Sequence, residues 1–452
     1  DLLNGISEVF KKHHSLLKKK MNDKKRRDIV NKLGILGEKY REKAYAGFNF
    51  KKSSLSVQQI NTFLTLTLQY IDHSISANKR KDGLYHAYNL IDFSMDTISI
   101  KPLYEMLEGQ VAVLSSGYLN PKESLAVLDA LKNSKMYRED QNSYMLYPDK
   151  DLPRFLTKNL IPSKLLENSK LAAEMIKAGN ESILQKDING NYHFNGSFNN
   201  AESLKKALDK LKNTPLAHLA KTDYKNFLDI FERIFNHKAF TGRSGTFFSY
   251  EGLGIIYWHM VSKLLLPVQE NITRANETSA GKKITGKLID YYYEIRAGIG
   301  INKSPEVYGA FPTDPYSHTP ANKGAQQPGM TGQVKEDIIN RRAEMGLKIK
   351  EGCLSFEPSF LNPDEFHHSE KSFDFFDVHG KQQSITVQKN QLAFTFCQVP
   401  VVYSRTGKTK ITVLYSNGKS ESMKGNKLNK TISKDIFDRT GIIKQITYFT
   451  RL

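Results

Sequence analysis

Residues 304–333 read SPEVYGAFPTDPYSHTPANKGAQQPGMTGQ, and the rest of the chain is organised around this stretch. It holds five Pro and four Gly among bulky aromatic, imidazole and amide side chains. A flexible linker would lack those bulky side chains, and long loops inside compact domains are commonly functional. We therefore predict a structured loop with a functional role, in which His318 and Gln327 are candidate binding residues.

A helical pattern begins directly after this loop. Val334, Ile338 and Ile339 are spaced for one helix face, which places Thr331 at the N-cap. Backbone N–H groups are free at a helix N-terminus and bind anions, and Gly332 has no Cβ to obstruct an approaching ligand. The motif is compatible with a phosphate site at Thr331 and Gly332, and equally with a helix cap that binds nothing.

The length of 452 residues suits one large domain with an appendage. No run of about 18 apolar residues occurs, so we expect a soluble globular protein. Cys353 and Cys397 give neither a disulfide framework nor a zinc motif, which favours a cytoplasmic location. The chain begins at Asp1 without a basic and then apolar leader, and we interpret it as a fragment of a longer protein.

The formal net charge is +19, and residues 11–32 are its densest part. A basic patch can bind nucleic acid or a membrane surface. These lysines and arginines are interleaved with Leu16 and Leu17 at helical spacing, and no aromatic platform or Gly-rich module accompanies them. We interpret the cluster as a solvated helix face and predict neither a nucleic-acid nor a membrane partner.

A crowded polar and aromatic loop follows the first three helical patterns, which cover residues 1–77. The third pattern is capped by Ser56 and has Ile60 and Leu64 on its expected inward face. Residues 78–89 then read NKRKDGLYHAYN. Aromatic faces stack on a pyranose while carboxylates and amides bind its hydroxyls, so the loop is either a sugar subsite or an ordinary helix-ending turn. Its candidate substrate-binding residues are Arg80, Tyr85, His86, Tyr88 and Asn89.

Other polar residues lie inside apolar helical patterns. Glu108 precedes the apolar run 111–114, so we expect a buried carboxylate that is paired with a neighbour or a substrate hydroxyl. Glu251 and His259 are eight residues apart, within about 80° of each other on a helix, so both could face one cavity. A lone histidine on a helix can equally be structural. Trp258, the only tryptophan, lies beside it, and Glu108 and Trp258 are further candidate substrate-binding residues.

Two turn-rich segments lack the residues of the binding loops that they suggest. Asp187 and Asn189 begin a calcium-like pattern, but the remaining ligands and the closing Glu are missing. Residues 241–246 are punctuated by glycine without the lysine of a nucleotide P-loop. We predict no metal site.

The patterns predict a mainly α fold. Ten or eleven helical patterns precede residue 350, with polar and aromatic loops at their ends, so residues 1–350 are expected to form an (α/α)6-type helical toroid with the site at one mouth. Period-two patterns begin at Cys353, and Asn417-Gly418 is a hairpin signal. Residues 351–452 are therefore expected to form a small C-terminal antiparallel β domain that resembles a sandwich.

The order of these motifs resembles the inverting β-glycoside phosphorylases related to cellobiose and β-glucan phosphorylases. The stretch MTGQVKEDIINRRAEMGLKIKEGCLSFEPSFLNPDEF, residues 330–366, resembles the end of the family's toroid, where a Thr-Gly pair opens a helix. YEGLGIIYWH resembles the helix start whose histidine, here His259, contacts phosphate, and Asp82 with Glu108 is similar to the catalytic aspartate and a following glutamate. The resemblance covers residues 56–452. The family's Asp-Trp-Asn-Asp signature is absent.

The resemblance implies phosphorolysis with inversion, in which one carboxylic acid protonates the leaving oxygen while phosphate attacks from the opposite face. Asp82 would be that acid, with its pKa raised by apolar surroundings. Inorganic phosphate is then a co-substrate and no cofactor is expected, with an oligosaccharide as partner and a homodimer as one possible assembly. The implied phosphate-binding residues are His259, His318, Gln327, Thr331 and Gly332.

Three alternatives remain open. In an inverting hydrolase on the same fold, Glu251 would act as a second carboxylate that activates water. A non-catalytic carbohydrate-binding fragment would be favoured by an Asp82 side chain that is turned away from the cavity. A nucleic-acid-binding protein would show steeply salt-dependent binding.

Overall fold

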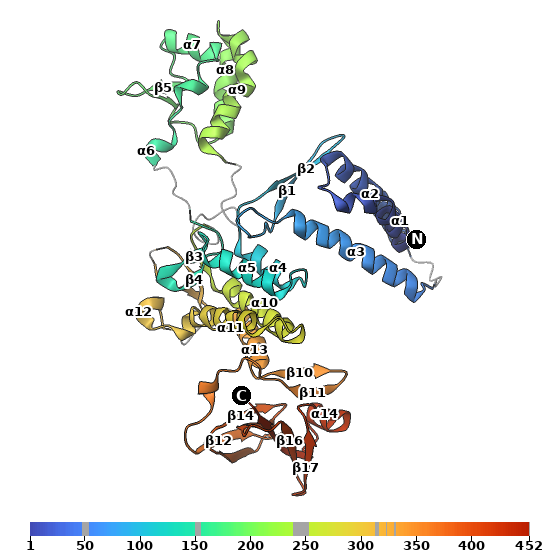
Figure 1. The fold of residues 1–452 in the computed structure, drawn as a ribbon. Coiled ribbons are helices and arrows are strands. Elements are labelled where there is room, and N and C mark those ends of the chain that lie inside the picture. The colour runs from blue at the N-terminus through green and yellow to red at the C-terminus, as the bar shows by residue number, and fades with distance from the viewer. Residues whose placement is uncertain are drawn as a thin grey trace. The chain divides into compact units, whose positions relative to one another are not determined.

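The computed structural model describes residues 1–47, 54–149, 155–237, 253–311, 316–321, 323–329 and 331–451 (Figure 1). Helices account for about 47% and strands for about 21% of the structure. The chain forms two compact units, unit 1 with residues 1–148 and 255–452 and unit 2 with residues 149–254. Among the helices of the described residues, none is long and apolar enough to cross a membrane.

The predicted mainly α toroid is wrong, because no toroid is present in the described residues. Several loops that were expected to connect paired helices instead form short sheets, and residues 149–254 separate as a unit of their own. The predicted boundary at residue 350 stays a prediction. The short sheets of unit 1 are β1 (Asn89–Phe93) with β2 (Ile98–Pro102), β3 (Tyr137–Arg138) with β4 (Ser143–Tyr144), and β7 (Ile256–Tyr257) with β8 (Tyr316–Thr319) and β9 (Gln326–Pro328).

Three helices form the N-terminal part of unit 1: α1 (Leu2–His13), α2 (Asp23–Tyr45) and α3 (Val57–Ala77). Ser56 caps α3 in a capping box with Gln59, as the sequence predicts. The rings of Phe10 and Tyr70 stack with centroids 4.2 Å apart, which joins α1 to α3. The predicted inward face of α3 is wrong, since Ile60 and Leu64 are exposed.

Helix α10 (Trp258–Glu277) is central to the next layer and contacts α4 (Leu107–Ser115), α11 (Lys282–Ala297) and α13 (Thr331–Glu344), and it also contacts α5 (Pro121–Lys132). The buried Asn271 amide fixes α10 to its neighbours. It donates to the Leu114 carbonyl at 2.9 Å and accepts from the Ser124 hydroxyl of α5 at 2.8 Å. The loop over residues 304–333 contains α12 (Pro305–Tyr308), β8 and β9, so it is structured where it is described.

Helix α13 has an inverted polarity. The apolar residues that were expected to face inward, Val334, Ile338 and Ile339, are exposed. The opposite face is buried although every buried residue on it is polar or charged. These buried residues are Gln333, Glu336, Asn340 and Glu344. Hydrophobic burial therefore does not explain the orientation of this helix, and its polar contacts must contribute.

The C-terminal part of unit 1 is built on a five-stranded sheet in the order β14-β15-β18-β16-β17. The expectation of an antiparallel domain is wrong in one respect, because β15 and β18 pair in parallel. The Asn417-Gly418 hairpin is confirmed between β16 and β17. The strands and helix of this part are β10 (Leu347–Lys350), β11 (Cys353–Phe356), β12 (Lys371–Phe376), β13 (Gln382–Val387), β14 (Gln391–Phe396), β15 (Val399–Arg405), β16 (Lys410–Tyr415), β17 (Ser420–Lys424), α14 (Lys430–Phe437) and β18 (Ile443–Thr450).

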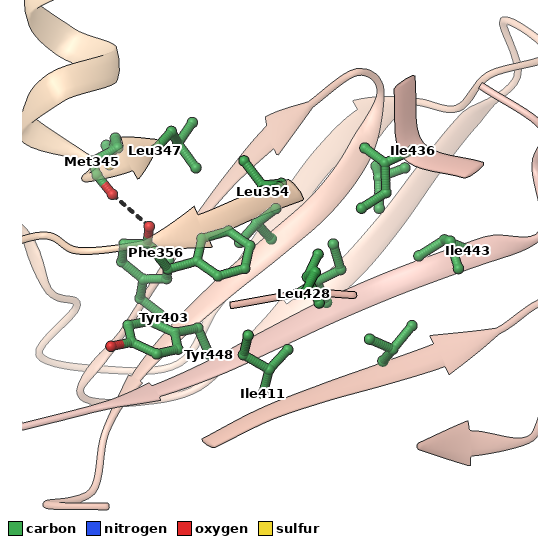
Figure 2. Close-up of a cluster of buried hydrophobic side chains, with 14 of the residues drawn as sticks. Met345, Leu347, Leu354, Phe356, Tyr403, Ile411, Leu428, Ile436, Ile443 and Tyr448 are labelled. Carbon is green, nitrogen blue, oxygen red and sulfur yellow. Dashed lines mark hydrogen bonds between the residues drawn. The ribbon is translucent and has the colours of Figure 1, made fainter. Parts of the chain in front are cut away.

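A cluster of buried hydrophobic side chains fills the core of this part of the chain, and it includes three aromatic rings in contact (Figure 2). Phe356 stacks on Tyr448, and Tyr403 packs against the same ring. The Tyr403 hydroxyl donates to the Met345 carbonyl at 2.5 Å, so the end of α13 is tied to the sheet. Gly346 makes this junction possible, since its φ of +67° and its close approach to Glu357 exclude a side chain.

Unit 2 has its own hydrophobic core, in which Phe194, Phe227 and Phe231 are fully buried. Asp187 closes the β5–β6 turn, because its carboxylate accepts from the backbone of Asn189 and Asn191 at 2.8 Å. Its role is therefore structural. The elements of unit 2 are α6 (Phe155–Lys158), α7 (Lys170–Lys177), β5 (Leu184–Lys186), β6 (Tyr192–Phe194), α8 (Ala201–Lys210) and α9 (Ala217–Phe235).

Candidate functional site

A series of backbone hydrogen bonds brings the starts of α4, α10 and α13 into one region of unit 1. The Leu107 N–H donates to the Leu146 carbonyl at 3.0 Å, and the Leu146 N–H donates to the Ile255 carbonyl at 2.8 Å. The chain continues from there into β7, which pairs with β8, which pairs with β9 just before α13. Motifs that are far apart in the sequence therefore meet at the N-terminal ends of three helices, where backbone N–H groups are free.

The 78–89 loop packs on the first turn of α4. The buried Gln110 side chain accepts from the Tyr85 N–H at 2.9 Å and donates to the Tyr85 carbonyl at 2.8 Å. Gly109 lets the loop approach this closely, because a Cβ at that position would lie 2.9 Å from the Tyr85 carbonyl oxygen. The loop is thus held by a side-chain amide and a missing side chain, neither of which the sequence analysis identified.

Four predicted sugar-binding residues come together around a cavity of about 510 Å³. Tyr85 is buried, while Tyr88 is exposed and offers a ring to a ligand. Burial lowers the pKa of His86, which leaves its imidazole neutral near pH 7. The predicted residues that line the cavity are Tyr85, His86, Tyr88 and Glu108, and α1 and α3 add Phe10 and Tyr70.

Asp82, the candidate acid, is not among the residues that line this cavity. Its carboxylate is bound in a bidentate manner by Arg80, with N–O distances of 2.8 to 3.1 Å, and Arg80 also pairs with Glu105 at 3.2 Å. The Arg80 hydrogen bonds lower the pKa of Asp82. The predicted rise of the Asp82 pKa is therefore wrong, because a guanidinium rather than apolar side chains surrounds the carboxylate. Asn89 also stabilises the 78–89 loop, since its side-chain amide donates a hydrogen bond to the Asn78 side-chain oxygen at 2.9 Å.

The predicted phosphate-binding residues His259, His318 and Gln327 lie near one another on β7, β8, β9 and the start of α10. Tyr257 pairs with His318 across the sheet, their rings stack with centroids 5.0 Å apart, and the Tyr257 hydroxyl lies 3.4 Å from Nδ1 of His259. Ser317 contacts Nδ1 of His318 at 2.5 Å and donates to Gln327 at 3.1 Å. Sequence reasoning missed Tyr257 and Ser317, which link the predicted residues.

Helix α13 begins at Thr331, with Gly332 as its second residue, one position from the predicted N-cap. Its buried face brings a carboxylate to this cluster, because Oε1 of Glu336 lies 3.7 Å from Nε2 of His259. Burial and the positive charge of Lys263 lower the pKa of His259, while Glu336 opposes them. No sequence signal identified Glu336, since the opposite face of α13 was expected to be buried.

Trp258, a candidate substrate-binding residue, is buried and does not line the cavity beside α4. Its side chain is 0% exposed and its indole N–H donates to Thr319 at 2.8 Å. The Lys303 ammonium lies 4.6 Å from the centre of its ring. The ring is therefore part of the core that supports β8 and is not exposed for stacking on a sugar. Glu251 lies outside the described residues.

The comparisons with known proteins bear on unit 2. Residues 152–238 match the family model described as GH149 phosphorylase insertion domain 2. The matched segment lies within unit 2 and covers well under half of the chain. No curated protein matches the chain. The match supports a GH149-type glycoside phosphorylase, and so an enzyme of carbohydrate metabolism.

Proposed function

We propose that this protein takes part in the phosphorolysis of β-glucosidic bonds in oligoglucans, with inversion at the anomeric carbon and release of glucose 1-phosphate. The observation that carries the proposal is the match of residues 152–238 to a glycoside phosphorylase insertion domain. An insertion domain has no evident use apart from the catalytic part into which it is inserted.

Two features of unit 1 support this reaction class. The cavity beside α4 combines aromatic rings with a carboxylate at Glu108, which is the composition that a pyranose requires. The cluster of His259, His318 and Gln327 lies near the start of α13, where Thr331 and Gly332 begin the helix. Imidazoles beside free backbone N–H groups provide hydrogen-bond donors for a phosphate dianion. Phosphate is accordingly the proposed co-substrate.

In the proposed reaction, phosphate oxygen attacks the anomeric carbon while the glycosidic oxygen accepts a proton and leaves with the shortened glucan. Asp82 stays the candidate donor of that proton. Its ion pair with Arg80 holds it ionised, so it can donate only after substrate binding displaces the guanidinium and the carboxylate takes up a proton. The acid step therefore requires a rearrangement of the Arg80–Asp82 pair.

The test is incubation with β-1,2-, β-1,3- and β-1,4-linked gluco-oligosaccharides, with and without inorganic phosphate. Glucose 1-phosphate and free glucose are assayed separately. Phosphate-dependent glucose 1-phosphate that is lost in Asp82→Asn and kept in the exposed control Asp96→Asn would support both the reaction and the acid. Glucose release that is indifferent to phosphate would instead support a hydrolase.

A second candidate is favoured by one observation. The Asp82 side chain is 46% exposed, paired with Arg80 and absent from the cavity lining, which suits a non-catalytic carbohydrate-binding protein. Under that alternative, calorimetry would detect binding of gluco-oligosaccharides while no linkage gives turnover. Loss of that binding in Tyr88→Ala would place the ligand in the cavity beside α4.

A further inference from the structure

The buried face of α13 contains polar groups to which the described part of the chain offers no hydrogen-bond partner. Glu336 is 5% exposed and Asn340, one turn further on, is 2% exposed. Oε2 of Glu336 and both polar atoms of the Asn340 amide have no hydrogen-bond partner among the residues that the structure describes. The remaining oxygen of Glu336 is the one that approaches His259, at 3.7 Å.

Such an arrangement destabilises the folded protein. An unpaired polar atom inside a protein loses its hydration without compensation, and a buried carboxylate loses more than an amide does. Native proteins satisfy most buried polar groups, so exceptions call for a functional explanation. Apolar side chains are available on the same helix at Ile338 and Ile339, yet they face outward. The inward orientation of Glu336 is therefore not a result of burying apolar surface.

We propose that Glu336 is a positioning residue that orients the His259 imidazole and favours a proton on its Nε2 when a phosphate group binds. This inference rests on the proposed function. Glu336 itself touches neither phosphate nor sugar in this arrangement, since its contact is with the ring nitrogen on the far side from the Tyr257 hydroxyl.

The two ring nitrogens of His259 have different contacts. Nε2 faces the carboxylate of Glu336, and a carboxylate oxygen favours a ring nitrogen that carries a hydrogen. Nδ1 faces the Tyr257 hydroxyl at 3.4 Å, a long contact that a phosphate oxygen can replace. With a hydrogen on each nitrogen, the imidazolium faces the Glu336 carboxylate with Nε2 and can donate a hydrogen bond to a phosphate oxygen from Nδ1. Without Glu336 the ring loses both the negative charge that favours this state and the contact that fixes its direction.

Glu336 opposes the effect of the other charges around His259 on the protonation of its ring. Burial, Lys263 on α10 and Lys335 on α13 lower the pKa of His259, whereas the carboxylate of Glu336 raises it. His318 lies on the other side of Tyr257, stacked on its ring. Removal of the Glu336 charge should therefore shift the ring to its neutral form at lower pH, where it binds a phosphate dianion less well.

The decisive experiment is a pH titration of the His259 ring by NMR in protein labelled at histidine, with the signal assigned through His259→Gln. We expect the titration midpoint of His259 to fall in Glu336→Gln, which has nearly the same shape without the charge. It should stay in place in Asp337→Asn, an exposed carboxylate on the same helix, and in Glu344→Gln, a buried carboxylate on the same face. An unchanged His259 midpoint in Glu336→Gln would overturn the proposal, whatever the activity of the protein.

Kinetics then separates positioning from mere structural support. In Glu336→Gln the KM for phosphate should rise severalfold at pH 7 while the KM for the glucan stays the same, since the ring takes up a proton less readily without the neighbouring carboxylate. Glu336→Asp should recover part of the loss. Equal effects on both KM values would point to a structural role and refute the inference. If the wild-type protein shows no phosphorolysis, the proposed function fails, and the NMR titration still decides the role of Glu336.

Discussion

Replacement of Glu344 by Gln should destabilise unit 1. Glu344 is 1% exposed and its carboxylate accepts from three side chains on two helices. The Tyr292 hydroxyl donates at 2.6 Å, Arg296 at 3.1 Å and Arg341 at 2.5 Å. Arg341 also pairs with Glu365, so the network joins α11, α13 and the segment that leads into the C-terminal sheet.

The size of the effect follows from these contacts. Removal of one partner of a buried ion pair costs about 3–5 kcal/mol when the other charge stays buried. Arg296 and Arg341 are about one-third exposed and can turn towards water, and the amide oxygen of Gln can still accept from Tyr292. We therefore expect a loss of about 2–3 kcal/mol. For a unit of this size that corresponds to a fall in Tm of about 3–4 °C.

Differential scanning calorimetry can measure this fall, since it separates the transitions of two units. The exposed Asp337→Asn on the same helix is the control and should shift the Tm by no more than about 1 °C. The transition of unit 2 should not move in either variant. A Tm for Glu344→Gln within 1 °C of the wild type would refute the idea that this buried carboxylate holds α13 in place.

Two further predictions follow from single positions. A methyl group at Gly109 would lie 2.9 Å from the Tyr85 carbonyl oxygen, so Gly109→Ala should weaken glucan binding by about tenfold in calorimetric titration. Gly34 in the interior of α2 is the control, because nothing lies within 4 Å of a Cβ there. Gly34→Ala should stabilise the helix by up to about 1 kcal/mol in thermal unfolding. Burial and Arg138 lower the pKa of Lys303 to about 8 in the folded protein. Between pH 8 and 10.5 the unfolded chain therefore binds more protons than the folded protein, and the stability rises with pH. Lys303→Met should unfold at a higher Tm than the wild type at pH 7 and lose that advantage by pH 10.5.

The local signals in the sequence predicted local structure well. The cap at Ser56, the turn at Asn417-Gly418 and the start of a helix at Thr331 all depend on a few neighbouring residues, and each was found within one position. Short-range chemistry determines such features, because a cap or a tight turn is satisfied by its own segment.

The global arrangement could not be predicted in the same way. Helix periodicity shows that Val334 and Ile338 share a face, but it does not say which face the surrounding protein covers. Unit 2, residues 149–254, was also missed. Its helical patterns were counted as part of the toroid, since a helical toroid and a helical insertion produce similar patterns.

At the candidate site, too, the sequence predicted the types of residue better than their surroundings. The sequence indicated that His259, His318 and Gln327 are suited to phosphate, and β7, β8 and β9 do bring them together. It gave the wrong environment for Asp82, because Arg80 is two positions away in the sequence and either a solvated or a paired guanidinium is compatible with that spacing. A pKa depends on which of these occurs.

The two buried carboxylates of α13 show how structure can separate a stabilising residue from a functional one. Glu336 and Glu344 lie on one helix face and are almost equally buried. Glu344 has three donors around its two oxygens, as expected of a group that contributes to stability. Glu336 has one imidazole at 3.7 Å and an oxygen for which the described residues provide no partner. Stability alone would favour an apolar residue at position 336, so the carboxylate there is better explained by what it does to His259.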